Sequence, residues 1–175
     1  MRRRHRIVPA LFLFLVTAIP SSLTAQARTG LLLGGTFDAY GFGEGLGAFV
    51  PTFRVTHLAG TGPGVDAALG VLPHGLSEGT LVMALDAGLA QGLGLGPATL
   101  LLKAGVSNLL AVGQTSFLFP GLQGGAGLIL PVDRRGGLRM ELTRHWYLAH
   151  GTVAPLWSAG LGFVVFPPGR HDLRR

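Results

Sequence analysis

The segment Gly137-Leu-Arg-Met-Glu-Leu-Thr-Arg-His-Trp-Tyr147 decides the fold class of this chain. Its alternate residues belong to two different faces. One face is apolar apart from Arg144 and the other is polar: Leu138, Met140, Leu142 and Trp146 against Arg139, Glu141, Thr143, His145 and Tyr147. A period of two residues predicts a β-strand. A soluble sandwich would bury the apolar face in a core, whereas a membrane β-barrel would turn it to lipid and line its lumen with the ionised face.

The same alternation recurs along the chain between clusters of turn-forming residues. We predict eight strands, over residues 29–40, 45–57, 64–72, 80–91, 99–107, 123–131, 137–147 and 157–166. Most reach the roughly nine to eleven residues that a tilted membrane strand needs, and an even number suits a closed antiparallel barrel. Segment 45–57 is the least regular, because Phe49 and Phe53 fit neither face cleanly and Pro51 suggests a bulge. The longest predicted connection, 108–122, carries Phe117-Leu-Phe-Pro120, the loop segment best suited to contact a partner.

Residues 1–27 are expected to be a cleaved signal peptide, followed by a barrel over 28–166 and a basic tail over 167–175. Four arginines precede a short apolar run, and Ala25-Gln-Ala27 supplies a cleavage site of the A-x-A type. The alternative is an uncleaved anchor helix, against which Pro9 and Pro20 argue. With four of the 14 Lys and Arg residues in this segment, ten remain against 8 acidic residues. The high pI is therefore mainly a targeting feature, and no nucleic-acid partner is expected.

Glycine is the most unusual part of the composition. The chain has 29 glycines and no cysteine. On the predicted inner faces the residues are small or charged, as a narrow eight-stranded lumen filled by its own side chains requires. Helical membrane spans are the rival interpretation, because residues 104–132 contain no charge. That segment is interrupted by glycine, proline and polar residues and holds no apolar run near the ~20 residues that a helix needs.

Two groups of side chains test the barrel interpretation. Aromatic residues should gather at one membrane interface if the first strand starts on the periplasmic side: Tyr40, Trp146, Tyr147 and Trp157. Charged residues inside the lumen should be paired: Asp66, Asp86, Lys103, Arg139 and Glu141. A hairpin centred near residue 95 would place Asp86 beside Lys103, and one centred near residue 76 would place Asp66 opposite Asp86. We interpret these charges as a plug of ion pairs, with a proton or ion path as the alternative.

Motifs for chemistry are weak. The histidines are scattered without metal-ligand spacing, so neither a metal nor a cofactor is predicted. Ser158, His145 and Glu141 form the one candidate set for a hydrolase, on the last two predicted strands, and no nucleophile-elbow motif surrounds the serine. We therefore predict no catalytic residues and no enzyme activity.

The chain resembles the small eight-stranded outer-membrane β-barrels of Gram-negative bacteria, such as the transmembrane domain of outer membrane protein A. The resemblance covers nearly all of the chain after the signal segment. It rests on that segment, the alternating strands and the aromatic-ended last strand, 157–166, after which a tail begins at Pro167. It implies an all-β, eight-stranded antiparallel up-and-down barrel that is monomeric in the outer membrane. Its partners would be outer-membrane lipids and the barrel-assembly machinery.

Two other functions stay open at this point. A soluble periplasmic lipocalin-like barrel would bind a small apolar ligand, and it needs Asp86, Lys103 and Glu141 to face solvent outside. An outer-membrane lipid-modifying enzyme needs Ser158, His145 and Glu141 to converge within hydrogen-bond reach, open to the membrane.

Overall fold

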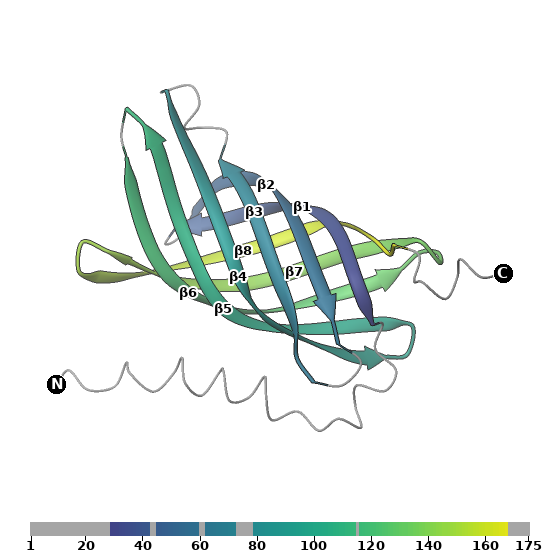
Figure 1. The fold of residues 1–175 in the computed structure, drawn as a ribbon. Helices are drawn as coiled ribbons and strands as arrows, with labels where there is room; N and C mark the ends of the chain where they lie inside the picture. The colour runs from purple at the N-terminus through teal and green to yellow at the C-terminus, as the bar shows by residue number, and fades with distance from the viewer. Residues whose placement is uncertain (1–28, 43–44, 60–61, 73–78, 115, 168–175) are drawn as a thin grey trace.

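The computed structural model describes residues 29–42, 45–59, 62–72, 79–114 and 116–167. Eight antiparallel strands close into one barrel in sequence order, β1 pairing with both β2 and β8 (Figure 1). The strands are β1 Gly30–Phe42, β2 Gly45–Leu58, β3 Gly64–Leu72, β4 Thr80–Leu95, β5 Ala98–Gly113, β6 Phe117–Pro131, β7 Gly136–Ala149 and β8 Thr152–Val165. The predicted fold class is confirmed. Within the described ranges, no helix is long and apolar enough to span a membrane.

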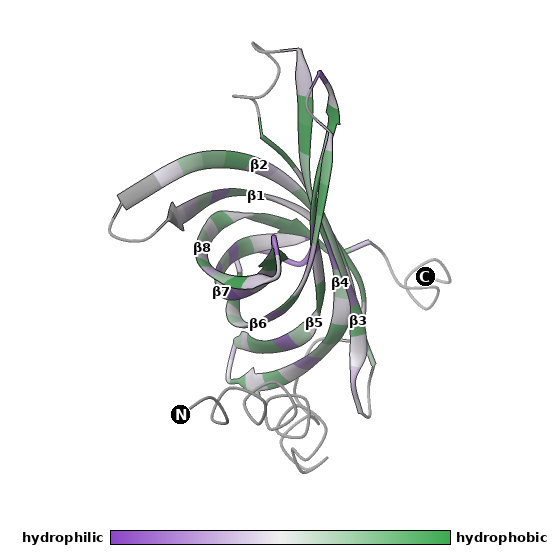
Figure 2. Cartoon of the chain, turned by 90° about the vertical axis from the view of Figure 1, so that its left-hand side faces the viewer, coloured by the Kyte–Doolittle hydropathy of each residue, from purple (hydrophilic) through white to green (hydrophobic). Residues whose placement is uncertain are grey.

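The stagger of the strands can be read from the pairing. A path of directly paired residues around the barrel from Gly41 of β1 returns to Leu31 of the same strand, a displacement of ten residues. The path runs through Trp157, Arg144, Gly124, Ala104, Leu89, Val65 and His57. Such stagger obliges the strands of a closed barrel to tilt, typically by about 35–45°. The tilted strands wrap around a narrow interior (Figure 2).

The barrel has two ends, which we name by what they carry. The terminal end carries both ends of the described chain together with the β2–β3, β4–β5 and β6–β7 connections (Figure 1). The turn end carries the other four connections. Two hairpins have two-residue turns that suit their sequences. His150 and Gly151 both have positive φ, as a type I′ turn requires, and Gly96 has φ 61° ahead of Pro97.

Several predicted loops are much shorter than expected, because the strands extend into them. The predicted connection 108–122 is strand except for residues 114–116, so Phe117-Leu-Phe-Pro120 lies in β6 and not in a loop. The predicted connections 92–98 and 148–156 likewise shrink to two residues each. Glycine ordinarily indicates a turn, because it readily adopts positive φ. In a narrow barrel it also serves as an inward-facing strand residue, because larger side chains do not fit there.

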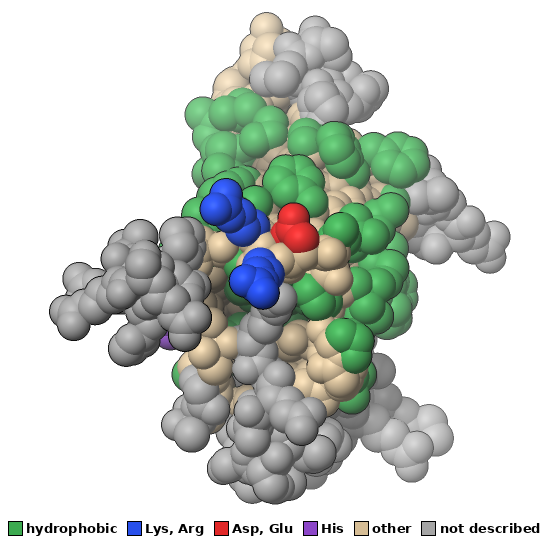
Figure 3. Space-filling view, turned by 90° about the vertical axis from the view of Figure 1, so that its right-hand side faces the viewer, with side chains coloured by type: hydrophobic (Ala, Val, Ile, Leu, Met, Phe, Trp, Pro, Cys, Tyr) green, Lys and Arg blue, Asp and Glu red, His purple; other side chains and the backbone are tan. Residues whose placement is uncertain are grey.

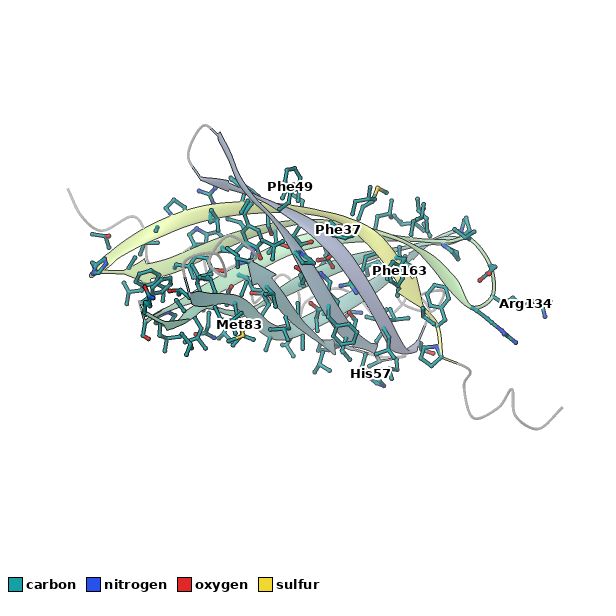
Figure 4. All side chains as sticks on the ribbon, turned by 90° about the horizontal axis from the view of Figure 1, so that it is seen from above. Phe37, Phe49, His57, Met83, Arg134 and Phe163 are labelled. Atoms are coloured by element: carbon teal, nitrogen blue, oxygen red, sulfur yellow. The ribbon has the colours of Figure 1, made fainter. Side chains whose placement is uncertain are left out.

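The two faces of the strands are reversed relative to a soluble protein. In β7 the polar residues are buried in the barrel, whereas Leu138, Met140 and Leu142 are exposed on its outside. Segment 45–58 is a regular strand after all. Phe49, Pro51 and Phe53 all point outward, and the register shift of this hairpin lies between Tyr40 and Gly41. Phe37, at 70 % exposure, points away from the barrel like Phe49 and Phe163 (Figure 4).

Inward-facing glycines make room for larger side chains beside them. A Cβ atom on Gly160 would lie 2.2 Å from Oδ1 of Asp38. Gly88 and Gly105, which pair directly between β4 and β5, approach so closely that a Cβ on either would meet the backbone of the partner strand at 2.3 Å and 2.1 Å. The glycine content is thus a packing requirement of the narrow interior.

Candidate functional site

The lumen is filled by side chains in three layers. At the terminal end an apolar layer closes the barrel: Leu32, Leu58, Ala90, Leu101, Ile129, Val164 and Phe166. At the turn end a second buried layer contains two tyrosines: Tyr40, Val50, Ala84, Tyr147 and Leu156. Charged and polar side chains occupy the space between them. The interior is therefore a packed core and not an open pore.

Glu141 of β7 lies at the centre of the charged layer. Its Oε2 is 2.7 Å from Nζ of Lys103 and 3.0 Å from Nη1 of Arg54. Arg139, two residues away on the same face, pairs with its Oε1. Three cations from β2, β5 and β7 thus converge on one carboxylate. Because parity places Arg54, Lys103, Arg139 and Glu141 on inward faces of their strands, barrel closure is enough to bring them together.

Two more carboxylates balance these cations. Oδ2 of Asp38 in β1 is 2.6 Å from Nη2 of Arg54, and Oδ1 of Asp66 in β3 is 3.0 Å from Nη2 of Arg139. All the ionised groups in this layer are at most 6 % exposed. Three cations face three carboxylates, so the cluster as a whole is neutral. Such pairing is the condition for keeping ionised groups out of water.

A second polar cluster lies between this ion-pair network and the tyrosine layer. The hydroxyl of Ser107 donates to Oδ1 of Asp86 at 2.5 Å, and its oxygen is 2.9 Å from the hydroxyl of Tyr147 and 3.1 Å from Nδ1 of His145. A hydroxyl has one proton, so Nδ1–H and Tyr147 must donate to Ser107. Nε2 of His145 is then free to accept from Ser158, whose Oγ lies 2.9 Å away.

This arrangement brings together two of the three residues of the predicted hydrolase set. Ser158 and His145 are within hydrogen-bond reach, but Glu141 pairs with cations, and the carboxylate on the histidine side is Asp86 at 3.9 Å from Nδ1. Ser158 is 4 % exposed and His145 is 1 % exposed, so neither is open to the membrane. The aromatic rings of Tyr40 and Tyr147 also pack against His145. Among the described residues, no group of three or more potential ligands could hold a metal ion.

The structure places all five predicted lumen residues, Asp66, Asp86, Lys103, Arg139 and Glu141, inside the barrel. The predicted neighbours were partly wrong. Asp86 pairs across the hairpin with Ser107 and not with Lys103, whose partner is Ala90. Asp66 lies opposite Gly88, two residues from Asp86, and so the costly pair of adjacent carboxylates is avoided. The error came from the hairpin centre, because the true turn at Gly96-Pro97 lies later than assumed.

Sequence reasoning missed two of the six ionised side chains in this network. Arg54 and Asp38 lie on the inward faces of β2 and β1, together with Thr36 and Thr56. The signal was present, since Thr52, Arg54 and Thr56 alternate with Pro51, Phe53 and Val55. Pro51 predicts a bulge at this place, and a bulge would interrupt the alternation.

The four predicted interfacial aromatics divide into two pairs. Tyr40 and Tyr147 are each 4 % exposed and face into the lumen, so their assignment to the membrane interface was wrong. Parity decides this, because Tyr147 shares the face of His145 and Arg139. Trp146 and Trp157 lie on the outside of β7 and β8, and the Trp157 side chain is 49 % exposed. The predicted cleavage residues Ala25 and Ala27 lie outside the described residues, as does all of the tail after Pro167.

Comparison with known proteins supports the fold alone. No protein-family model and no curated protein matches the sequence. Neisserial surface protein A (NspA) is similar in structure, with a TM-score of 0.54 and 13 % identity over 77 % of this chain and 93 % of its own. A de novo designed transmembrane β-barrel has a TM-score of 0.52 and 12 % identity over 80 % and 98 %. The outer membrane protein Ail of Yersinia pestis has a TM-score of 0.46 and 13 % identity over 78 % and 99 %.

The chain therefore has the fold of the small eight-stranded outer-membrane β-barrels, as the sequence resemblance predicted. A designed barrel and a natural surface protein both have this fold, so the likeness carries no specific activity with it.

Proposed function

We propose that this chain is an integral outer-membrane β-barrel protein of a Gram-negative bacterium, with a structural or surface-interacting role and a lumen plugged by paired charges. The main support is the distribution of side chains, which is the reverse of that in a soluble protein. Seven charged residues are buried inside, and large apolar residues such as Phe37, Phe163 and Leu161 are 59–70 % exposed outside. Water would penalise that outer surface, whereas lipid accepts it.

The same observation speaks against the soluble lipocalin-like alternative. That function needs an apolar interior that can admit a ligand and a polar exterior. Here Asp86, Lys103 and Glu141 face inward, and their partners fill the space that a ligand would need. The apolar grooves of the described surface lie on the outside of the barrel, such as the one of about 360 Å³ beside Phe53 and Leu85.

The lipid-modifying alternative has a hydrogen-bonded serine and histidine in its favour, but neither is accessible. A nucleophile must meet its substrate, and Ser158 lies under the tyrosine layer of the lumen. We therefore propose a role without catalysis, in which the Ser107 cluster stabilises the barrel interior.

The proposed partners follow from the closed barrel and its last strand. Because β1 pairs with β8, the sheet has no free edge to recruit a second copy, which supports a monomer. The barrel-assembly machinery is the proposed partner during insertion. The aromatic-ended last strand supports this, although the side chain of Phe166 turns into the lumen and not toward lipid.

Localisation and folding can be tested together. The complete chain, expressed in a Gram-negative host, should fractionate with the outer membrane and migrate faster on gels before heating than after it, because a closed barrel stays compact in mild detergent. A soluble periplasmic protein with a single migration would overturn the proposal.

A conductance measurement distinguishes a lumen plugged by ion pairs from a lumen that forms an ion path. The purified protein in planar bilayers should give no steady conductance, since all three layers of the lumen are packed. The paired change Arg54→Ser and Asp38→Ser removes large buried side chains without leaving either charge alone, and it should also give no steady conductance, because the apolar and tyrosine layers still close the lumen. Steady conductance from the unaltered protein would contradict the plug and favour the ion path.

A further inference from the structure

Arg144 is exceptional among the charged residues that the structure describes. Seven of them are inside the lumen: Asp38, Arg54, Asp66, Asp86, Lys103, Arg139 and Glu141. Three more form the β6–β7 turn at the terminal end: Asp133, Arg134 and Arg135. Arg144 remains, and it lies on the outer face of β7, between Leu142 and Trp146. A cation among lipid-facing residues needs a specific physical reason, because its cost rises steeply toward the bilayer midplane.

The surroundings of Arg144 form a small aromatic platform. Its guanidinium carbon lies 4.6 Å from the centre of the Trp157 ring, the residue paired with it across β7 and β8. On the other side its paired residue is Gly124, which has no side chain to cover it. Trp146 is two residues further along the same outer face. The guanidinium is thus oriented by one ring, and Arg144 itself is half-buried on the outer face, next to the buried backbone of Gly124.

Among the residues that the structure describes, no carboxylate forms an ion pair with this cation. The carboxylates of the lumen are on the opposite face of the sheet and are paired with Arg54, Lys103 and Arg139 or held by Ser107. Its guanidinium instead lies over the Trp157 ring. A guanidinium presents a planar set of donors that fits a phosphate with two parallel hydrogen bonds.

The position of Arg144 along the barrel matches a membrane interface. Arg135, in the turn at the terminal end, is nine residues before Arg144. At about 3.3 Å per residue and a tilt of about 40°, these residues are separated by roughly 23 Å along the barrel axis. This is close to the height of about 25 Å for the apolar band of outer-membrane barrels. Figure 3 shows the terminal end with a small charged patch surrounded by hydrophobic surface. Arg144 and the two tryptophans would then mark the opposite interface.

We propose that Arg144, with the platform of Trp157 and Trp146, is a binding site for the phosphate group of an anionic membrane lipid at the turn-end interface. The inference rests on the proposed membrane function and gives that surface a ligand class. Guanidinium–phosphate hydrogen bonds supply the charge pairing. The ring of Trp157 holds the guanidinium in place, and the partly exposed side chain of Arg144 on the outer face is where the headgroup would bind.

The chain itself supplies a probe for this site. Its only two tryptophans are Trp146 and Trp157, so tryptophan fluorescence reports on this platform and on no other part of the protein. The protein is placed in phosphatidylcholine vesicles that contain a minor fraction of phosphatidylglycerol. Bromine atoms, which quench at short range, are carried on the acyl chains of one lipid or of the other. We expect brominated phosphatidylglycerol to quench at least two-fold more than its bulk fraction predicts.

Three variants separate the site from general charge attraction. Arg144→Gln should abolish the preference for phosphatidylglycerol, and Arg144→Lys should keep part of it as a point charge without the planar fork. The matched control is Arg134→Gln, which removes the same charge at the terminal end. It should leave the preference unchanged. Adding inorganic phosphate at constant ionic strength tests the free anion as a ligand, and no competition is expected if the lipid is the source.

The outcomes distinguish the two levels of inference. Quenching by neither lipid would mean that the tryptophans are not in the bilayer, and the membrane function itself would fail. Equal quenching per mole by both lipids, with Arg144→Gln unchanged, would overturn the phosphate site while the membrane function stands. An equal loss of preference in Arg134→Gln would also overturn it, because the attraction would then be a property of the whole barrel. Competition by free phosphate would contradict a lipid-specific site.

Discussion

Arg139 and Arg144 lie five residues apart on one strand and meet opposite environments. Arg139 is fully buried in the lumen, where it pairs with Glu141 and Asp66. Arg144 is on the outer surface and rests on the ring of Trp157. The odd separation alone places them on opposite faces of β7. Identical side chains thus have different roles, one inside a neutral cluster of ion pairs and one at the boundary of an apolar band.

The difference shows how this barrel divides its tasks between its two faces. On the inner face the charged side chains are buried, so each requires a partner within the protein, and removal of one leaves others unpaired. In the proposed membrane setting the outer face has lipid as its neighbour, so charge is tolerated only where headgroups or water can reach it. The effect of a charged side chain on stability should therefore depend on its ion-pair partners on the inner face and on its depth in the bilayer on the outer face.

The largest expected effect on stability comes from removing a buried cation on the inner face. Arg139→Met should destabilise the folded barrel by about 3–5 kcal/mol, because Asp66 and Glu141 lose a partner in a buried site. The urea midpoint of unfolding in phospholipid vesicles measures it. Arg144→Met is the matched control on the outer face and should change the free energy of unfolding by less than about 1 kcal/mol, the usual range for an exposed cation–π contact. Similar losses in both variants would contradict the division between the faces.

A second prediction concerns the outer face, where the cost of a charge should depend on its depth in the bilayer. Leu142 and Leu148 are 52 % and 50 % exposed on the same outer face, but Leu148 is next to the last residue of β7. Leu142→Arg should reduce the free energy of unfolding by about 2–4 kcal/mol, and Leu148→Arg by about 0–1 kcal/mol, since the cost of a charge falls toward the interface. Unfolding titrations of both variants in the same vesicles compare them directly. Equal costs at the two positions would mean that the bilayer does not end near the two tryptophans.

The smallest effect concerns the space inside. Gly160→Ala should destabilise the barrel by about 1–3 kcal/mol, because the added methyl group would lie 2.2 Å from Oδ1 of Asp38 and force that carboxylate to move. Gly35→Ala is the matched control on the outer face. Its Cβ would meet only ordinary contacts, the nearest at 3.7 Å, so it should be neutral or slightly stabilising. Thermal unfolding in detergent micelles suffices to rank them, and a more stable Gly160→Ala variant would show that the interior has spare volume.

Sequence reasoning located the strands better than their ends. All eight were predicted, because the period of two residues survives in each of them. The predicted connections 92–98, 108–122 and 148–156 were too long. In 92–98 the reason is glycine, which means a turn in most proteins and also occupies strand positions in a narrow barrel. The predicted centre of the β4–β5 turn was therefore too early, which shifted the predicted register of this hairpin. As a result the predicted partner of Asp86 was Lys103, whereas its partner in the structure is Ser107.

The sequence by itself determined which residues of a strand share a face, since parity along a strand needs no knowledge of its neighbours. Residues such as Lys103, Glu141 and Trp157 could be assigned to the inside or the outside from the pattern alone. The tertiary structure decided which of them touch, because the contacts across the lumen depend on turn positions, on the ten-residue stagger and on closure of β1 against β8. Only closure joined Arg54 and Asp38 of the first hairpin to Glu141 of the last. Pairs such as Lys103–Glu141, Arg54–Glu141 and Arg139–Asp66 join strands far apart in the sequence, where local patterns hold no information about distance.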